Sequence, residues 1–161
     1  MLNAMAMRVA GYCTLLLIAA LSFSQEPAAE PWPKAAIIEP ADFAAALKSP
    51  AKQPTILCVA FPTLYNSKHI THAIYAGQGS KPEGIESLKK AVASLPKDSD
   101  IVMYCGCCPM KMCPNIRPAY RALKEMGFTN VRILDIPTNM QTDWYGKDYP
   151  FEAGSGAPAR Q

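Results

Sequence analysis

The chain has 161 residues, of which half are hydrophobic and 18% are charged, and this length suits one ordinary domain with a substantial core. Its net charge of +3 is small and is spread along the chain without a basic block, which argues against nucleic acid as the main partner. The feature that points to chemistry is the set of six cysteines, because four of them lie between Cys105 and Cys113.

The first 24 residues have the layout of a secretory signal. Arg8 precedes an apolar stretch over residues 9–23, and Ser22 and Ser24 are the small residues before a cut at Gln25. The stretch is short for a membrane span, which needs about 20 apolar residues. We therefore expect residues 1–24 to be a cleaved signal peptide and the protein to be periplasmic or secreted. It would contact a membrane only through an uncleaved signal segment, and its cysteines would work in an oxidising compartment.

After this segment, strand patterns alternate with helix patterns. A Pro- and Ala-rich stretch over residues 25–36 predicts an extended linker, and residues 151–161 predict a flexible tail. Helices are expected to begin near Pro40, Lys81 and Ile116. Short extended segments are predicted at residues 37–38, 55–61, 69–75, 100–104 and 131–134. This order predicts an α/β fold with a mostly parallel sheet, in which function gathers at the carboxyl ends of the strands.

The cysteine-rich loop over residues 105–113 reads CGCCPMKMC. Cys105 follows a buried strand and a helix follows the loop, so backbone N–H groups and the positive end of the helix dipole would favour its thiolate. Lys111 and Arg117 add positive charge that can hold an anion such as a sulfur oxyanion. We therefore predict that Cys105 is a nucleophile and the most acidic thiol. Cys58, near the end of another buried run, is expected to face the same crevice.

Other uses of these cysteines stay open. Cys105 and Cys108 form a C-x-x-C pair, which serves reversible dithiol chemistry and also forms half of many metal sites. Together with Cys107 and Cys113 they supply four thiolates, which is enough for zinc or copper(I). A third interpretation is a non-catalytic binding domain whose loop is stapled by disulfides.

Several stretches resemble the rhodanese-like domains, a family of single-domain sulfurtransferases. Residues 56–74, which end in HITHAI, resemble the family's "liDvRep.ey..gHIpgAi" stretch, and the strand ending at Cys105 is similar to its "ivvYC". Residues 123–134 and 144–150 are similar to its later "L...Gf.nV..L" and "W...g.P" segments. The resemblance covers residues 37–150 and implies a five-stranded parallel sheet with helices on both faces. It also assigns His69 a structural role, which weakens a metal interpretation of the H-x-x-H spacing of His69 and His72.

The resemblance implies that Cys105 holds the transferred sulfur as a persulfide and that Arg117 is the loop cation. From its C-x-x-C spacing, Cys108 is expected to resolve the adduct. Gly106, Cys107 and Lys111 are expected to contact the substrate. We thus expect an exported enzyme, a sulfurtransferase or thiol-redox protein, that needs no cofactor. Its partners would be a small sulfur donor or thiol acceptor, or a redox protein.

The chain departs from the family pattern in three ways. Cys58 and Ala60 stand where the family has Asp and Arg, and Lys68 stands where it has Gly. The segment that follows Cys105 is longer than in the family. Pro109 and Pro114 remove N–H donors that a cradle for thiosulfate would use. We therefore expect weak activity with thiosulfate and better activity with a thiol-bound sulfur donor.

Overall fold

Five parallel strands form the central sheet of the structure, a computed structural model that describes residues 30–49, 51 and 53–155. The strands are β1 (Ile37–Ile38), β2 (Thr55–Cys58), β4 (Ile74–Tyr75), β5 (Ile101–Tyr104) and β6 (Val131–Leu134). Their spatial order is β1-β6-β5-β2-β4. All four residues of β5 are buried, as is typical of a parallel strand covered on both faces.

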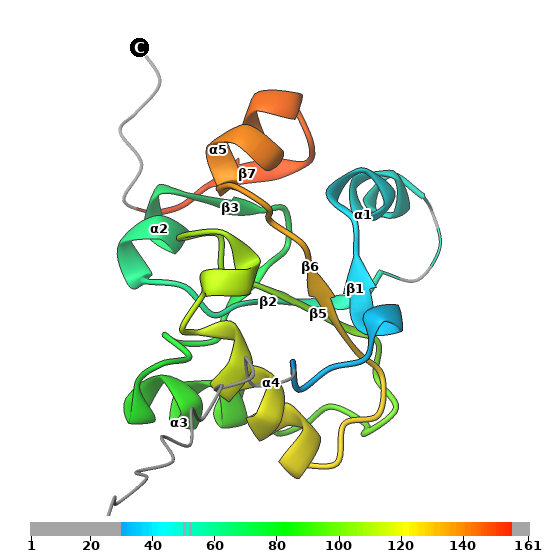
Figure 1. Cartoon of the computed structure of the whole chain (residues 1–161), viewed down its shortest axis with the longest axis vertical. Helices are drawn as coiled ribbons and strands as arrows, with labels where there is room; N and C mark the ends of the chain where they lie inside the picture. The colour runs from blue at the N-terminus through cyan, green and yellow to red at the C-terminus, as the bar shows by residue number, and fades with distance from the viewer. Residues whose placement is uncertain (1–29, 50, 52, 156–161) are drawn as a thin grey trace, which may run out of the picture.

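Helices cover both faces of this sheet (Figure 1). α3 (Pro82–Ala91) and α4 (Ile116–Glu125) lie together on one face, and α1 (Pro40–Leu47) lies on the other. Both α1 and α3 begin with a proline, a residue that suits the first helical turn because N–H groups there have no partner within the helix. The predicted fold, an α/β five-stranded parallel sheet with helices on both faces, is confirmed.

A second, two-stranded sheet lies beside the carboxyl edge of the first. In it, β3 (Lys68–Ile70) pairs antiparallel with β7 (Phe151–Ala153). The extended segment predicted at residues 69–75 is therefore two strands, β3 and β4, separated by a turn in which His72 has a φ of 63°. Short helical elements fill the connections: α2 (Pro62–Ser67), α5 (Met140–Asp143), and the 3₁₀ turns η1 (Lys34–Ala36), η2 (Met110–Met112) and η3 (Tyr145–Lys147).

The ordered domain extends beyond the predicted boundaries at both ends. Trp32 is buried and packs edge-on against Tyr120 with ring centroids 5.6 Å apart. The expected linker over residues 25–36 is therefore wrong for its last residues. Likewise, the expected tail over residues 151–161 is wrong for Phe151–Ala153, because pairing with β3 holds them in β7.

The predicted signal peptide over residues 1–24 lies outside the described residues, as does the end of the tail from residue 156. Among the residues that the structure describes, no helix is long and apolar enough to cross a membrane.

Candidate functional site

The candidate site lies at the carboxyl edge of the sheet, where β2 and β5 end side by side. Cys58 is the last residue of β2 and pairs with Tyr104, after which Cys105 begins the loop. Both cysteines line one cavity of about 360 Å³, a volume within the range of small-molecule sites. The prediction that they face one crevice is confirmed. The other lining residues are Leu64, Tyr65, Ser67, Lys68, Tyr104, Gly106, Cys107, Asn139, Met140, Gln141 and Tyr145.

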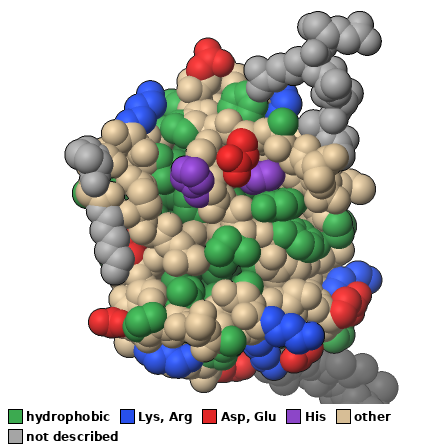
Figure 2. Space-filling model, turned by 180° about the vertical axis from the view of Figure 1, so that it is seen from behind, with side chains coloured by type: hydrophobic (Ala, Val, Ile, Leu, Met, Phe, Trp, Pro, Cys, Tyr) green, Lys and Arg blue, Asp and Glu red, His purple; other side chains and the backbone are tan. Residues whose placement is uncertain are grey.

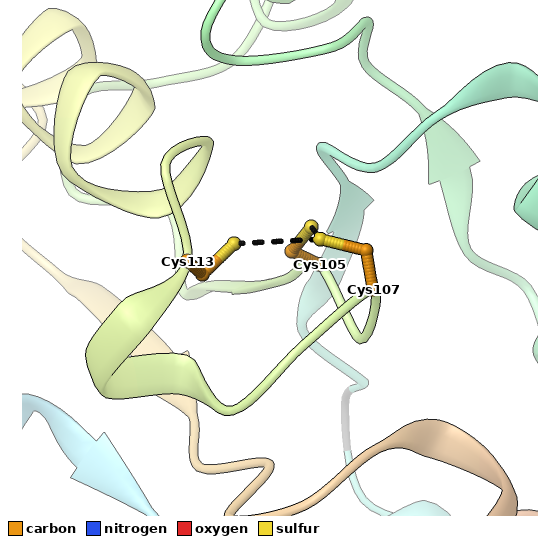
Figure 3. A group of neighbouring side chains, drawn as sticks. All are labelled: Cys105, Cys107 and Cys113. Atoms are coloured by element: carbon orange, nitrogen blue, oxygen red, sulfur yellow. Dashed lines mark hydrogen bonds between the residues drawn. The ribbon is translucent and has the colours of Figure 1, made fainter.

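Three thiols of the loop converge beside this cavity (Figure 3). The sulfurs of Cys105, Cys107 and Cys113 all lie within 4.8 Å of one another. Cys107 Sγ lies 3.1 Å from Cys105 Sγ and 3.9 Å from Cys113 Sγ. Cys108 adds a fourth sulfur, 3.4 Å from that of Cys107, but it does not line the cavity. The thiol nearest to Cys105 is therefore Cys107, which sequence analysis placed among the substrate contacts, rather than the expected partner Cys108.

All five cysteines in the described part of the chain are free thiols. The interpretation as a disulfide-stapled domain thus finds no disulfide among them. Cys58 is almost fully buried at the wall of the cavity, and burial raises the pKa of its thiol to about 11. It therefore stays protonated at neutral pH.

Asn115 contacts the cluster of cysteine thiols, and its role was not predicted from the sequence. Its side chain is fully buried, and Nδ2 donates hydrogen bonds to Cys105 Sγ at 3.2 Å and to Cys107 Sγ at 3.8 Å. Its Oδ1 accepts from the backbone N–H of Ser80 at 3.0 Å. The available signal was an Asn directly before a helix, a position that this residue type favours. That signal predicts a capping role and gives no indication of a contact with sulfur.

The amino terminus of α4 acts on Cys113. Hydrogen bonds from Cys105 and Cys107, followed by backbone N–H groups of Asn115 and Ile116, outweigh burial and lower the pKa of Cys113 to about 3. The clustered N–H groups at the start of the helix thus stabilise a thiolate on this residue.

The same arrangement keeps the Cys105 thiol protonated. Hydrogen bonding with Cys107 favours its thiolate, but the neighbouring Cys113 and burial outweigh this and raise the pKa of Cys105 to about 12. Hydrogen bonding to Cys105 also raises the pKa of Cys107. The structure thus favours the thiolate on Cys113, whereas the sequence predicted it on Cys105. The loop folds back so that Cys113, and not Cys105, meets the helix.

The predicted cations of the loop do not line the cavity. Arg117 pairs with Glu30, donates to the carbonyl of Lys111 at 2.8 Å and stacks over Trp32. Lys111 lines a separate depression beside the same tryptophan. The expected roles of these two residues in holding an anion are thus not supported by their positions. The charged residue that does line the cavity is Lys68.

The backbone conformation of Gly106 sets how the loop turns after β5. Its φ of +76° is a left-handed conformation that favours glycine. A Cβ atom at this position would lie only 2.1 Å from Cγ of Met140. Gly106 therefore lets the loop pass against Met140 while Cys105 and Cys107 stay beside the cavity.

In the H-x-x-H pair, the His69 side chain has a structural role. Both ring nitrogens of His69 are engaged: Nδ1 lies 2.8 Å from the carbonyl of Tyr65, and Nε2 lies 3.1 Å from Glu152 Oε1. Glu152 also accepts from the backbone N–H of His72 at 3.1 Å, so the two histidines flank an acidic side chain (Figure 2). These contacts tie β3 to β7.

Comparison with known proteins agrees with this architecture. A family model for the rhodanese-like domain matches residues 39–136. The chain belongs to the rhodanese-like domain family. The comparison with curated proteins found no match.

Solved structures share the fold. The crystal structure of the Alr3790 protein from Anabaena sp. is 24% identical, with a TM-score of 0.57 over 73% of this chain and 92% of that one. The solution structure of the rhodanese-like domain of the same protein is 22% identical, with a TM-score of 0.55 over 78% and 86%. The BH2092 protein from Bacillus halodurans is 21% identical, with a TM-score of 0.57 over 77% and 80%.

Proposed function

We propose that the protein is an exported sulfurtransferase in which Cys105 carries sulfur and Cys107 is the resolving thiol. The observation that supports this most directly is the position of Cys105 in the cavity wall with Cys107 Sγ 3.1 Å from its sulfur. This position is at the carboxyl edge of a parallel sheet, where α/β proteins place their ligand sites. The two thiols are close enough to form a disulfide after a small movement of the loop.

In the first step, the proton of Cys105 passes through Cys107, to which Cys105 donates at 3.1 Å, to the Cys113 thiolate 3.9 Å further on, and Cys105 attacks the outer sulfur of a persulfide donor, R–S–SH. The donor's S–S bond breaks, R–S⁻ leaves and takes the proton from Cys113, and Cys105 becomes a persulfide. An acceptor thiol then attacks the outer sulfur and regenerates Cys105.

Without an acceptor, the Cys107 thiol loses its proton and attacks Cys105 Sγ. This attack forms a Cys105–Cys107 disulfide and releases the outer sulfur as hydrogen sulfide. The Cys107 sulfur is oxidised from the thiol to the disulfide level, the outer sulfur is reduced to sulfide, and the Cys105 sulfur keeps its oxidation state, so the step is balanced. A reducing partner thiol would restore the resting state, which accounts for a thiol-redox role at the same site.

The decisive experiment is intact-mass analysis of alkylated protein after exposure to an organic persulfide without acceptor. Wild type should form the internal disulfide, and Cys105→Ser should gain no sulfur. Cys107→Ser should accumulate one added sulfur on Cys105. Cys108→Ser is the matched control, and it should behave as wild type because Cys108 lies outside the cavity. If Cys108→Ser accumulated the added sulfur on Cys105 instead, Cys108 would be the resolving thiol. Sulfur uptake by Cys105→Ser would reject the proposal.

Export is supported by the signal layout over residues 1–24. Amino-terminal sequencing of protein from the periplasm or medium should give Gln25 as the first residue. An intact Met1 in the cytosol would contradict export.

A second candidate function, soft-metal binding, is favoured by the convergence of Cys105, Cys107 and Cys113. At a metal–sulfur distance of about 2.3 Å, tetrahedral thiolates lie about 3.8 Å apart. The Cys107–Cys113 separation of 3.9 Å matches this spacing, and the Cys105–Cys107 separation of 3.1 Å would have to widen. Thiolate ligands suit zinc or copper(I). Metal analysis of protein purified without oxygen should find a stoichiometric metal ion if this function is correct.

A further inference from the structure

Among the described residues, the charge that lines the cavity beside Cys105 is positive. Lys68 is the charged member of its lining, which otherwise consists of cysteine, aromatic, apolar and uncharged polar residues. In the described part of the chain, Lys68 forms no ion pair with a carboxylate. A small molecule in this cavity therefore meets positive charge and no competing acid.

Hydrogen bonds hold the backbone of Lys68 in place, whereas its side chain is exposed and can change conformation. Its carbonyl accepts a hydrogen bond from Tyr145 Oη at 2.8 Å, and β3 pairs it with Ala153 of β7. Its Nζ lies 5.6 Å from the ring centroid of Tyr145 and 5.4 Å from that of Phe151, distances at which a cation is attracted to an aromatic face. Lys68 is exposed, so its ammonium group can turn toward an anion in the cavity.

The cysteine loop itself lacks several of the N–H donors that a small inorganic anion would need. The N–H of Met110 donates to the carbonyl of Ile136, and the N–H of Cys113 donates to that of Met110. Pro109 and Pro114 have no N–H group. Four residues of the loop region therefore offer no free N–H group to an anion on the reacting sulfur, whereas an anion at the other end of a longer donor can reach Lys68.

We infer that the sulfur donor is a small organic persulfide with a carboxylate at its far end, and that Lys68 is the residue that selects it. The persulfide lies against Cys105, the carbon chain lies along Leu64 and Met140, and the carboxylate pairs with the Lys68 ammonium group. This inference rests on the proposed function for the reaction, and it adds the substrate class and a specificity-determining residue.

The test compares three donors that differ in terminal charge: the persulfides of 3-mercaptopropionate, 2-mercaptoethanol and cysteamine. Wild type should show the highest kcat/KM for the carboxylate donor. Lys68→Met should lower kcat/KM for that donor by about three- to five-fold, as expected for an exposed ion pair, and leave the neutral donor unchanged. Lys68→Arg should retain the preference, and Lys68→Glu should shift it to the cysteamine donor.

Lys97→Met is the matched control, because Lys97 is also exposed and also lies over an aromatic ring, 4.3 Å from that of Phe128, but does not line the cavity. It should leave all three kcat/KM values unchanged. The preference of wild type should also weaken at high salt, since exposed charge pairs are screened.

Binding without reaction separates this inference from the proposed function. In Cys105→Ser protein, 3-mercaptopropionate should shift the NMR signals of cavity residues, and the further change Lys68→Met should weaken this binding. Turnover that is lost in Cys105→Ser but has the same donor preference in wild type and Lys68→Met would overturn the inference alone. Turnover that persists in Cys105→Ser would overturn the proposed function, and the binding measurement would still decide the role of Lys68.

Discussion

Substitution of Gly106 by Ala offers a quantitative test of how the loop is held beside the cavity. The left-handed φ of +76° costs a residue with a Cβ atom about 1 to 2 kcal/mol. The added Cβ would also lie 2.1 Å from Cγ and 2.9 Å from Sδ of Met140, and overpacking of this kind typically costs about 1 to 3 kcal/mol. We expect Gly106→Ala to lower the free energy of unfolding by about 2 to 5 kcal/mol.

Gly127 provides a matched control. It has a similar φ of +86°, but a Cβ there would meet no atom within 4 Å. Gly127→Ala should therefore show the backbone cost alone, about 1 to 2 kcal/mol. Urea denaturation under reducing conditions measures both changes as shifts in midpoint at unchanged slope.

A double-mutant cycle with Met140→Ala isolates the contact. Because an Ala side chain lacks the Cγ and Sδ atoms that clash, Gly106→Ala should cost no more in that background than Gly127→Ala costs in wild type. The reasoning would be refuted if Gly106→Ala were no more damaging than Gly127→Ala, or if its cost were unchanged by Met140→Ala. Where the protein still folds, persulfide formation on Cys105 should fall, because Met140 lines the same cavity.

Three further predictions test other contacts. At neutral pH, Cys113→Ser should lose about one thiolate of ultraviolet absorbance and Cys108→Ser should not; in wild type this absorbance should persist as the pH falls toward the Cys113 pKa of about 3, since thiolate exists above that pKa. Asn115→Ala should lower the free energy of unfolding by about 1 to 3 kcal/mol, measured in urea, because the fully buried Asn115 side chain and its hydrogen bonds to Ser80 and Cys105 are lost. Glu152→Gln should cost less than about 1 kcal/mol, since the carboxylate is partly exposed, and should leave sulfur transfer unchanged.

The long apolar runs and the helix-opening prolines made most of the fold predictable. Buried runs such as residues 100–104 can only be central strands when helices alternate with them, and the structure places β5 there. α2 was not predicted because none of its residues is buried, so it carries no apolar stripe from which a helix can be recognised.

β7 was not predicted for another reason. Its three residues pair with β3, which lies some eighty positions earlier in the chain, and a strand this short has too few residues to show a period of two. Only the long-range pairing specifies it. The same contact brings Glu152 to His69, a partner that no local pattern in the sequence indicates.

The residue types and the location of the site could be predicted, but not which thiol is ionised or where the neighbouring cation points. The sequence places Cys105 at a strand end before a helix, and this led to the assignment of the acidic thiol. Which thiol meets the helix depends on how the intervening turn η2 folds, and that turn brings Cys113 to the N–H groups of Asn115 and Ile116. Helical geometry likewise directs Arg117 toward Glu30, a contact that residue spacing within the loop does not reveal.

The two candidate functions use the same atoms and therefore exclude each other at any one moment. A metal ion held by Cys105, Cys107 and Cys113 would occupy the lone pairs with which Cys105 attacks sulfur and Cys113 accepts the proton. Lys68 lies outside this sulfur cluster and lines the cavity in front of it. Because it contributes no thiolate, a change at Lys68 should leave metal affinity intact while altering donor preference. A positive charge in the cavity wall is useful to a protein that receives an anionic substrate.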